Sequence, residues 1–282
     1  MITFDRVGYR YKNKVEALSD ISCTIGPGLH LMAGENGAGK TTFLHLCAGL
    51  LYPTSGTCDF KGVELRRREP EVLSRVQYFS SQSAYFFPAG DIRAMVKSHA
   101  CFFPGFDGDM LQRNLSVFGI DEGQTFRSMS AGTFSKAALA YMFSLGCDVL
   151  LLDEPTVWLD PVSRHQFRQM MVECVGPEQA VIVSTHDFAE AEALYDSLMI
   201  IHRGKLLLDS PVAEIAARLG FVTGPSRRQD ALYSEMGVGG IRSIVPVTED
   251  ENDTQPDFML LYSALISDCS ASILKHLKSD VL

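Results

Sequence analysis

The sequence has few of the features that stabilise small or secreted scaffolds. Its seven cysteines are odd in number, are never closer together than Cys47 and Cys58, and form no C-x-x-C pair. They indicate neither a zinc site nor a disulfide framework, and are typical of buried thiols in a reducing cytosol. The chain has 282 residues. A chain of this size buries about three quarters of the surface that its unfolded form exposes, so its core needs no such support.

An excess of basic residues is also lacking, since the formal net charge is -9. This charge argues against a protein that coats DNA or RNA, and we expect no nucleic-acid partner. The N-terminus has no basic stretch followed by an apolar core, so we expect no signal peptide. The apolar stretch from Ala137 to Cys147 is well short of the ~18 residues that suggest a membrane span. Any role at a membrane therefore requires a partner protein.

Short apolar runs rich in Val and Ile alternate with helical patterns along much of the chain. The predicted strands are Leu29 to Ala33, Val76 to Phe79, Val149 to Leu152, Ala180 to Ser184 and Leu198 to His202. This alternation predicts an α/β fold with a mostly parallel core sheet. Between Phe79 and Val149 the strand pattern gives way to three predicted helices, Asp91 to Ala100, Asp107 to Phe118 and Thr133 to Leu145. We interpret them as a helical insertion in the sheet domain.

The part of the chain after residue 159 begins with a clear helix signal, and its composition then changes. Asp160-Pro161 predicts an N-cap and a first-turn proline for a helix that runs to Val175, where Gly176-Pro177 stops it. After Leu219-Gly220 the predicted segments are a linker from Thr223 to Arg228, an acidic polar stretch from Thr248 to Asp257, and a strand and final helix within Phe258 to Leu282. We assign no chemistry to this tail.

The sharpest motif lies directly after the first predicted strand of the core sheet. The pattern G-x-x-x-x-G-K-[ST] is satisfied by Gly34, Glu35, Asn36, Gly37, Ala38, Gly39, Lys40, Thr41 and Thr42, and it opens an apparent helix. Glycines let successive backbone N–H groups point inward at a phosphate, and the helix N-terminus adds partial positive charge. Lys40 is expected to reach the β- and γ-phosphate oxygens, and the Thr41 hydroxyl to contact Mg²⁺.

A second motif ends the predicted strand at Val149 to Leu152 with two carboxylates, Asp153 and Glu154. Ligands of open α/β sheets bind at such carboxyl ends. By itself the pair is also explained by a strand that is followed by an acidic turn. Together with the phosphate loop, it predicts that Asp153 holds the Mg²⁺ shell and that Glu154 polarises a water molecule for attack on the γ-phosphate.

These motifs, in this order, resemble the ATP-binding subunits of ABC transporters, and the match runs from the N-terminus to about residue 222. The resemblance implies a P-loop NTPase fold with an antiparallel N-terminal β-subdomain. It implies a nucleotide-binding domain over 1–222, with a helical subdomain at about 83–148, and it leaves 223–282 as a C-terminal accessory region of unknown role.

The resemblance assigns roles to four further residues. Tyr11 resembles the family's aromatic that stacks on adenine, with Tyr9 as the alternative, and a plain strand residue is also possible. Gln82 resembles the glutamine that senses Mg²⁺ and the attacking water. His186 resembles the switch histidine at the γ-phosphate, and Asp160 resembles the aspartate that crosses the dimer interface.

The family's signature loop, usually Leu-Ser-Gly-Gly-Gln, has one candidate here, the segment from Met129 to Thr133. Ser130 and Gly132 keep the hydroxyl and the amide that grip the γ-phosphate of ATP bound to the opposite subunit. Ala131 replaces a glycine, and a positive φ at that position would strain it. A simple helix N-cap at Ser130 is the alternative interpretation.

Aromatic residues are dense at two places that flank the helical insertion, Ser83 to Pro88 and Cys101 to Asp107. They indicate either local core packing or a groove for a helix of a membrane partner. The second phrase and the altered signature also resemble the branch linked to export of peptide antibiotics such as bacitracin and lantibiotics.

The resemblance thus implies an ATPase subunit that uses ATP and Mg²⁺, dimerises with itself or a homologous subunit, and powers an integral membrane permease from the cytoplasmic face. Three rivals stay open. The first is a soluble ABC-type ATPase, which usually carries a coiled coil or a second nucleotide domain. The second is a GTPase or small-molecule kinase, which lacks support because Asn13-Lys-Val-Glu16 does not match the motif that recognises the nucleotide base. A nucleotide-gated regulatory module with slow hydrolysis is the third.

Overall fold

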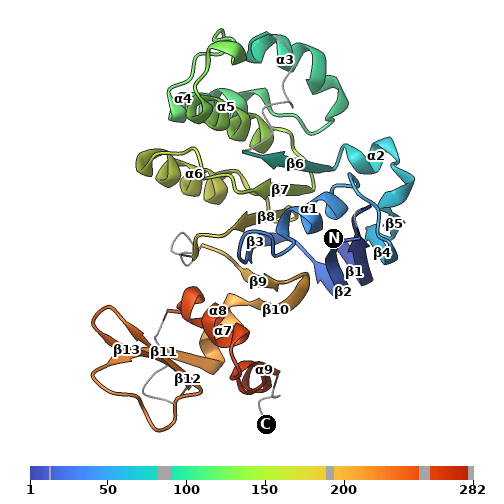
Figure 1. Cartoon of the computed structure of the whole chain (residues 1–282). Helices are drawn as coiled ribbons and strands as arrows, with labels where there is room; N and C mark the ends of the chain where they lie inside the picture. The colour runs from blue at the N-terminus through green and yellow to red at the C-terminus, as the bar shows by residue number, and fades with distance from the viewer. Residues whose placement is uncertain (13, 82–89, 189–193, 248–254, 279–282) are drawn as a thin grey trace.

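A six-stranded sheet forms the centre of the computed structural model, which describes residues 1–12, 14–81, 90–188, 194–247 and 255–278 (Figure 1). The strand order is β10-β9-β3-β8-β7-β6. The strands are β3 (Gly28–Ala33), β6 (Val76–Ser80), β7 (Val149–Asp153), β8 (Ala180–Thr185), β9 (Ser197–His202) and β10 (Lys205–Pro211). Neighbours are parallel except β9 and β10, which are antiparallel. The predicted α/β class and its five strands are therefore confirmed.

The two faces of this sheet belong to different hydrophobic clusters. Along β7, Leu150 and Leu152 face a cluster that includes the helices α5 (Ala131–Ser144) and α6 (Pro161–Cys174). Val149 and Leu151 face the cluster around α1 (Lys40–Cys47). Since successive side chains of a strand point to opposite faces, a strand covered on both sides must be apolar throughout. This is why the sequence of β7 is a continuous apolar run.

An antiparallel N-terminal sheet lies beside α1, as the resemblance implied (Figure 1). Its order is β2-β1-β4-β5. The strands are β1 (Ile2–Arg10), β2 (Glu16–Ile25), β4 (Ser55–Phe60) and β5 (Val63–Glu64). The rings of Phe4 and Phe43 stack with centroids 4.5 Å apart, which joins this sheet to α1. The short helices η1 (Leu65–Arg67) and α2 (Pro70–Leu73) then lead to β6.

Among the described residues between β6 and β7, where the sequence predicts a helical insertion, stand three α-helices. They are α3 (Ile92–His99), α4 (Gly108–Phe118) and α5, with short turns at η2 (Ala100–Phe102) and η3 (Phe126–Ser128). Asp91, Asp107 and Ser130 cap them by accepting hydrogen bonds from backbone N–H groups of their first turns. The Ser130 cap starts α5 at Ala131, two residues before the predicted Thr133.

The α6 helix follows the predicted start signal. The Asp160 side chain accepts a hydrogen bond from Ser163 N–H, and Pro161 occupies the first turn. The helix ends at Cys174, because Val175, the predicted last residue, has extended backbone angles (φ -82°, ψ 119°).

The C-terminal residues fold against the same core. Of two predictions for them, one is wrong and the linker is confirmed only at 225–228, which lie outside helices and strands. After α7 (Val212–Arg218), a three-stranded sheet has the order β11-β13-β12, from β11 (Leu219–Gly224), β12 (Tyr233–Gly237) and β13 (Gly240–Pro246). Thr223 and Gly224, predicted as linker, end β11, because Arg242 and Ile241 of β13 pair with them. The expected domain boundary after residue 222 thus falls inside a strand.

The segment after the acidic stretch forms two helices, α8 (Phe258–Ile266) and α9 (Ser270–Lys278), where a strand and a helix were predicted. Asp257 caps α8 by accepting a hydrogen bond from Leu260 N–H. Phe258, Leu260, Leu261 and Leu265 are buried in the cluster that also holds β7 and β9. Helical spacing buries these residues together, so tertiary packing decides between helix and strand here. Among the described residues, none of the helices has the length and apolar character needed to cross a membrane.

Candidate nucleotide-binding site

The phosphate-loop motif connects the end of β3 to the start of α1, as the sequence predicts. Gly39 is the N-cap of α1 and has φ 116°, a conformation that L side chains rarely adopt. A Cβ on Gly34 would lie 2.3 Å from the carbonyl oxygen of Ile201, so β9 leaves room only for glycine there. The two outer glycines of the motif are therefore required by backbone geometry and by close packing.

Lys40 lies at the centre of the loop and is 6% exposed. Its Nζ donates hydrogen bonds to the carbonyl oxygens of Gly34, at 2.7 Å, and Glu35, at 3.2 Å. The same Nζ is 3.5 Å from Glu154 Oε1. Burial lowers the pKa of Lys40, and the charges of Glu154 and Asp153 oppose that effect. The ammonium is thus fixed beside both acidic residues of the second motif.

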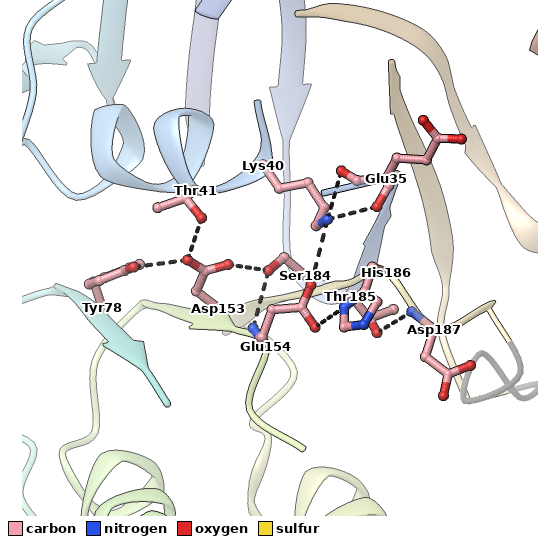
Figure 2. A network of polar contacts seen from close by, with 11 residues as sticks. Glu35, Lys40, Thr41, Tyr78, Asp153, Glu154, Ser184, Thr185, His186 and Asp187 are labelled. Atoms are coloured by element: carbon pink, nitrogen blue, oxygen red, sulfur yellow. Dashed lines mark hydrogen bonds and ion pairs between the residues drawn. The ribbon is translucent and has the colours of Figure 1, made fainter. Parts of the chain in front are cut away.

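Asp153, at the carboxyl end of β7, is 4% exposed and accepts three hydroxyl hydrogen bonds (Figure 2). Thr41 Oγ1 donates to Oδ2 at 2.7 Å, and Tyr78 OH donates to the same oxygen at 3.0 Å. Ser184 Oγ donates to Oδ1. A buried carboxylate is stable only when its oxygens have such partners. The bond from Thr41 joins the two predicted metal ligands directly.

Glu154 follows Asp153 with its backbone in the left-handed region, at φ 51°. A non-glycine residue in that conformation costs about 1–3 kcal/mol and is found mostly at functional sites. Its N–H donates to Ser184 O at 3.1 Å and to Ser184 Oγ at 3.2 Å. Its Oε2 is 2.9 Å from His186 Nδ1, while its Oε1 faces Lys40. The turn therefore aims the Glu154 carboxylate between the loop lysine and the histidine that follows β8.

A cavity of about 610 Å³ opens beside these groups. The predicted residues that line it are Tyr11, Glu35, Asn36, Gly37, Gly39, Lys40, Thr41, Thr42, Asp153 and Glu154. Tyr11 OH is hydrogen-bonded to Thr42 Oγ1 at 3.0 Å, so the aromatic ring stands at the rim of the phosphate loop. Tyr9, the alternative aromatic, makes an edge contact with the Tyr11 ring but does not line the cavity.

The candidate signature loop lies outside this cavity. Ser130 caps α5 by accepting a hydrogen bond from Thr133 N–H at 3.1 Å. Ala131 is the first residue of α5 and is not among the residues with positive φ, so the expected strain at this position is absent. A Cβ on Gly132 would lie 2.9 Å from the carbonyl oxygen of Trp158. Glycine is therefore needed at 132, where the next loop comes close, and not at 131.

Asp160 lies next to this loop and also outside the cavity. Its carboxylate accepts hydrogen bonds from Ser163 N–H at 2.9 Å and from Ser163 Oγ at 2.8 Å, and Lys136 Nζ lies 3.3 Å away. These contacts, the backbone hydrogen bond above all, lower the pKa of Asp160 to about 2. The side chain that resembles the family's interface aspartate thus caps α6 within this chain.

Gln82, predicted at the nucleotide and the metal, lies outside the described residues, as do the aromatics of 83–88. The aromatics after Cys101 divide between the two interpretations. Phe103 and Phe106 pack against the main core, whereas Phe102 is 66% exposed.

Sequence reasoning missed three residues of the site. Tyr78 and Ser184 hold Asp153, and His45, which is packed edge-on against Tyr78, lines the cavity. Burial lowers the pKa of His45, against the opposing charge of Asp153. Tyr78 lies on β6 and Ser184 on β8, two strands that the sequence predicts, but the sheet order of the structure is what places both strands next to β7.

The donor set fits Mg²⁺. Among the described residues, no group of three or more His, Cys, Asp and Glu side chains could enclose a metal ion. Mg²⁺ is usually held by one or two protein oxygens together with water and substrate phosphates. The Thr41 hydroxyl and the Asp153 carboxylate, directly hydrogen-bonded, are oxygens of this kind.

Known protein sequences are similar to this chain over much of its length. The family model described as "ABC transporter" matches residues 18–157. The ABC transporter ATP-binding protein NatA of Bacillus subtilis (strain 168) is 30% identical over 224 residues, which cover 73% of this chain and 88% of that protein. The ABC transporter ATP-binding protein YtrB of the same organism is 28% identical over 193 residues, which cover 68% of this chain and 65% of that protein. The chain thus spans slightly less than two thirds of YtrB.

The fold also matches solved structures. The ATP-binding cassette MJ0796, a dimer in a post-hydrolysis state bound to ADP and Pi, superposes with a TM-score of 0.62 at 19% identity. The match covers 75% of this chain and 98% of that one. At this identity the likeness shows a shared fold.

Proposed function

The chain belongs to the family of ABC transporter ATP-binding proteins, which are P-loop ATPases, and from this premise we propose that it binds Mg²⁺-ATP in the cavity beside the phosphate loop and hydrolyses it to drive a separate membrane permease. The supporting observation is that Lys40, Asp153 and Glu154 line one cavity and that His186, which directly follows β8, contacts Glu154.

Phosphate binding is assigned to the loop between β3 and α1. Its backbone N–H groups and the positive end of the α1 dipole favour a triphosphate, and Lys40 adds a full charge at the cavity wall. Thr41 and Asp153 would hold Mg²⁺, which supplies charge neutralisation at the phosphate oxygens when bound. Tyr11, at the rim, presents a ring on which adenine stacks.

Glu154 is the proposed general base. Its Oε1 and Oε2 face Lys40 and His186, so two neighbours fix its orientation before any substrate arrives. A water molecule held by this carboxylate gives up its proton to a Glu154 oxygen as the water oxygen bonds to the γ-phosphorus. The bond between the γ-phosphorus and the oxygen that bridges it to the β-phosphate breaks at the same time, and ADP leaves with that electron pair. Chemistry of this class depends mostly on positioning and charge stabilisation. We retain Gln82 as a proposed contact of the metal and the water.

A second subunit would complete the site. Ser130, Gly132 and Asp160 stand outside the cavity of their own chain, near the N-termini of α5 and α6. We propose that the Ser130 end of α5 binds the γ-phosphate of ATP held by a second copy or a homologous subunit. Groups supplied in trans to a phosphoryl transfer are worth about 10³–10⁵ in rate in related NTPases. Closure of the dimer and hydrolysis would therefore be coupled.

The permease partner would place this chain at the cytoplasmic face of a membrane. In this proposal residues 1–222 form the nucleotide-binding domain, with a helical subdomain at about 83–148, and 223–282 form an accessory region. Closure on ATP and reopening after hydrolysis would move the permease. A nucleotide-gated module with slow hydrolysis is the alternative that the altered signature leaves open.

Two variants test the proposal. Lys40→Ala removes a charge-assisted contact of about 1.5–3 kcal/mol and should weaken ATP binding at least tenfold in calorimetric titration. Lys61→Ala is the matched control, since Lys61 pairs with Asp148 on the surface. Equal ATP affinities of the two variants would remove the phosphate loop from the mechanism.

Glu154→Gln should keep ATP binding, abolish turnover and allow an ATP-bound dimer to accumulate in size-exclusion chromatography. Glu214→Gln on α7, which breaks a surface pair with Arg218, is the control. Normal hydrolysis by Glu154→Gln would show that another group is the base. Single-turnover hydrolysis by the unmodified chain separates an active ATPase from the slow regulatory module.

A further inference from the structure

One side chain of the C-terminal region packs against residues that lie near the nucleotide site in sequence, on β9 and after β8. Tyr262, on α8, is 4% exposed, although tyrosine hydroxyls usually remain at a polar surface. Its hydroxyl is 3.0 Å from His202 Nδ1, at the end of β9. Its ring packs on Phe188, with centroids 4.8 Å apart and an angle of 39° between the planes. Phe188 lies two residues after His186, the proposed switch histidine.

The same hydroxyl faces the phosphate loop. Burial raises the pKa of Tyr262, the Glu35 carboxylate raises it further, and a hydrogen bond with the Glu35 backbone opposes both effects. Glu35 lines the nucleotide cavity, and its carbonyl oxygen accepts a hydrogen bond from Lys40. The Glu35 charge that raises the pKa of the phenol thus belongs to a residue that is itself bonded to the loop lysine.

The end of β9 links these contacts to the rest of the loop. Gly204, in the turn after His202, donates its N–H to Ala38 O at 2.8 Å. Gly34 packs directly on the Ile201 carbonyl, as described above. The phosphate loop thus packs on the end of β9. Tyr262 is hydrogen-bonded to His202 at this same strand end.

We propose that Tyr262 is a positioning residue through which the accessory region controls the nucleotide site, by holding the His202 end of β9, on which the phosphate loop packs, and Phe188 behind His186. This inference rests on the proposed ATP binding and goes beyond it, because it gives α8 a role. Coupling between two sites is reciprocal, so nucleotide binding stabilises the docking of α8 to the same extent that docked α8 favours nucleotide binding.

Tyr262→Phe tests the hydroxyl while it keeps the ring on Phe188. Loss of one hydrogen bond that orders the loop should raise KM for ATP about fivefold and leave kcat within about twofold. Tyr233→Phe is the matched control: Tyr233 lies in the same region, on β12, and its hydroxyl donates to Glu235. That variant should keep the wild-type KM. A purely structural role would give both variants similar losses of stability and no KM difference, which would overturn the inference.

Hydrogen exchange on the unmodified chain provides an independent measurement if Tyr262→Phe folds poorly. A non-hydrolysable ATP analogue at saturation should slow amide exchange in α8, at residues 258–266, and leave β12, at residues 233–237, unchanged. Unaltered exchange in α8 would refute the coupling. If the unmodified chain binds no nucleotide, the proposed function fails, whereas intact binding with equal KM in both tyrosine variants rejects only the role of Tyr262.

Discussion

Replacing Ser184 by alanine tests how the acidic pair is held, because this buried serine contacts both members. Its Oγ donates to Asp153 Oδ1 and also accepts a hydrogen bond from Glu154 N–H. The backbone carbonyl of Ser184 keeps a bond to the same N–H in the variant. The substitution therefore deletes one hydrogen bond to a buried carboxylate and loosens the strained turn at Glu154 without removing its backbone support.

The expected loss of stability follows from the bond to Asp153. A hydrogen bond to a charged group contributes about 1.5–3 kcal/mol, and Asp153 retains its other donors, Thr41 and Tyr78. We expect the free energy of unfolding of Ser184→Ala to fall within that range. Reorientation of Glu154 should also lower kcat about tenfold, which corresponds to 1.4 kcal/mol in the barrier.

Ser144→Ala is the control for this experiment. Ser144 is as fully buried as Ser184, but its Oγ donates to the Tyr141 carbonyl within α5. Loss of this neutral bond should cost about 0.5–1.5 kcal/mol and leave kcat unchanged. Urea unfolding without nucleotide and steady-state ATPase rates measure both quantities. The reasoning about the Asp153–Glu154 turn would be refuted by two results together. These are a Ser184→Ala protein that is no less stable than Ser144→Ala and a kcat of that protein equal to the wild-type value.

Two further predictions concern the second loop. Ala131→Gly restores the usual family residue. It should lower the free energy of unfolding by about 0.5–1 kcal/mol in thermal unfolding and bring no gain in ATPase rate, because Ala131 is already helical. A marked rise in rate would contradict this expectation. Asp160→Asn keeps a helix cap without the charge. Since the folded pKa of Asp160, about 2, lies below the ordinary aspartate pKa of 3.8, its charge stabilises the fold above pH 3.8, and this contribution is lost as the pH falls toward 2. The variant should therefore be less stable at pH 7 and should approach wild-type stability at about pH 2 in chemical unfolding; a constant difference across that pH range would show that the charge plays no part.

Local sequence signals explain which features were predictable. The phosphate loop, the strand that ends in Asp153, the helices that begin near Asp91 and Asp107 and the cap at Asp160 each depend on a few consecutive residues, because backbone geometry at turns and helix ends is a local property. The family resemblance added the positions of Tyr11 and His186, and the structure brings both close to the predicted loop.

The failures occurred where long-range packing decides. The strand expected after Phe258 is a helix, because α8 buries its apolar residues in the core cluster that also contains β9. The positive φ considered for Ala131 is absent, since the glycine requirement lies at Gly132, where Trp158 approaches from a distant loop. In both cases the deciding contact comes from residues far away in the chain, which no local pattern records.

The sequence by itself determined the chemistry of this protein: a glycine-rich turn, one lysine and a pair of carboxylates at a strand end, at spacings that suit a triphosphate. Only the tertiary structure decided how these groups are held, through Tyr78 and Ser184 on Asp153, and where the C-terminal region meets the end of β9, through Tyr262 and His202. The reason is physical: the motif residues are consecutive, so their geometry is local, whereas their supports come from other strands and from α8 and meet them only when the core has formed.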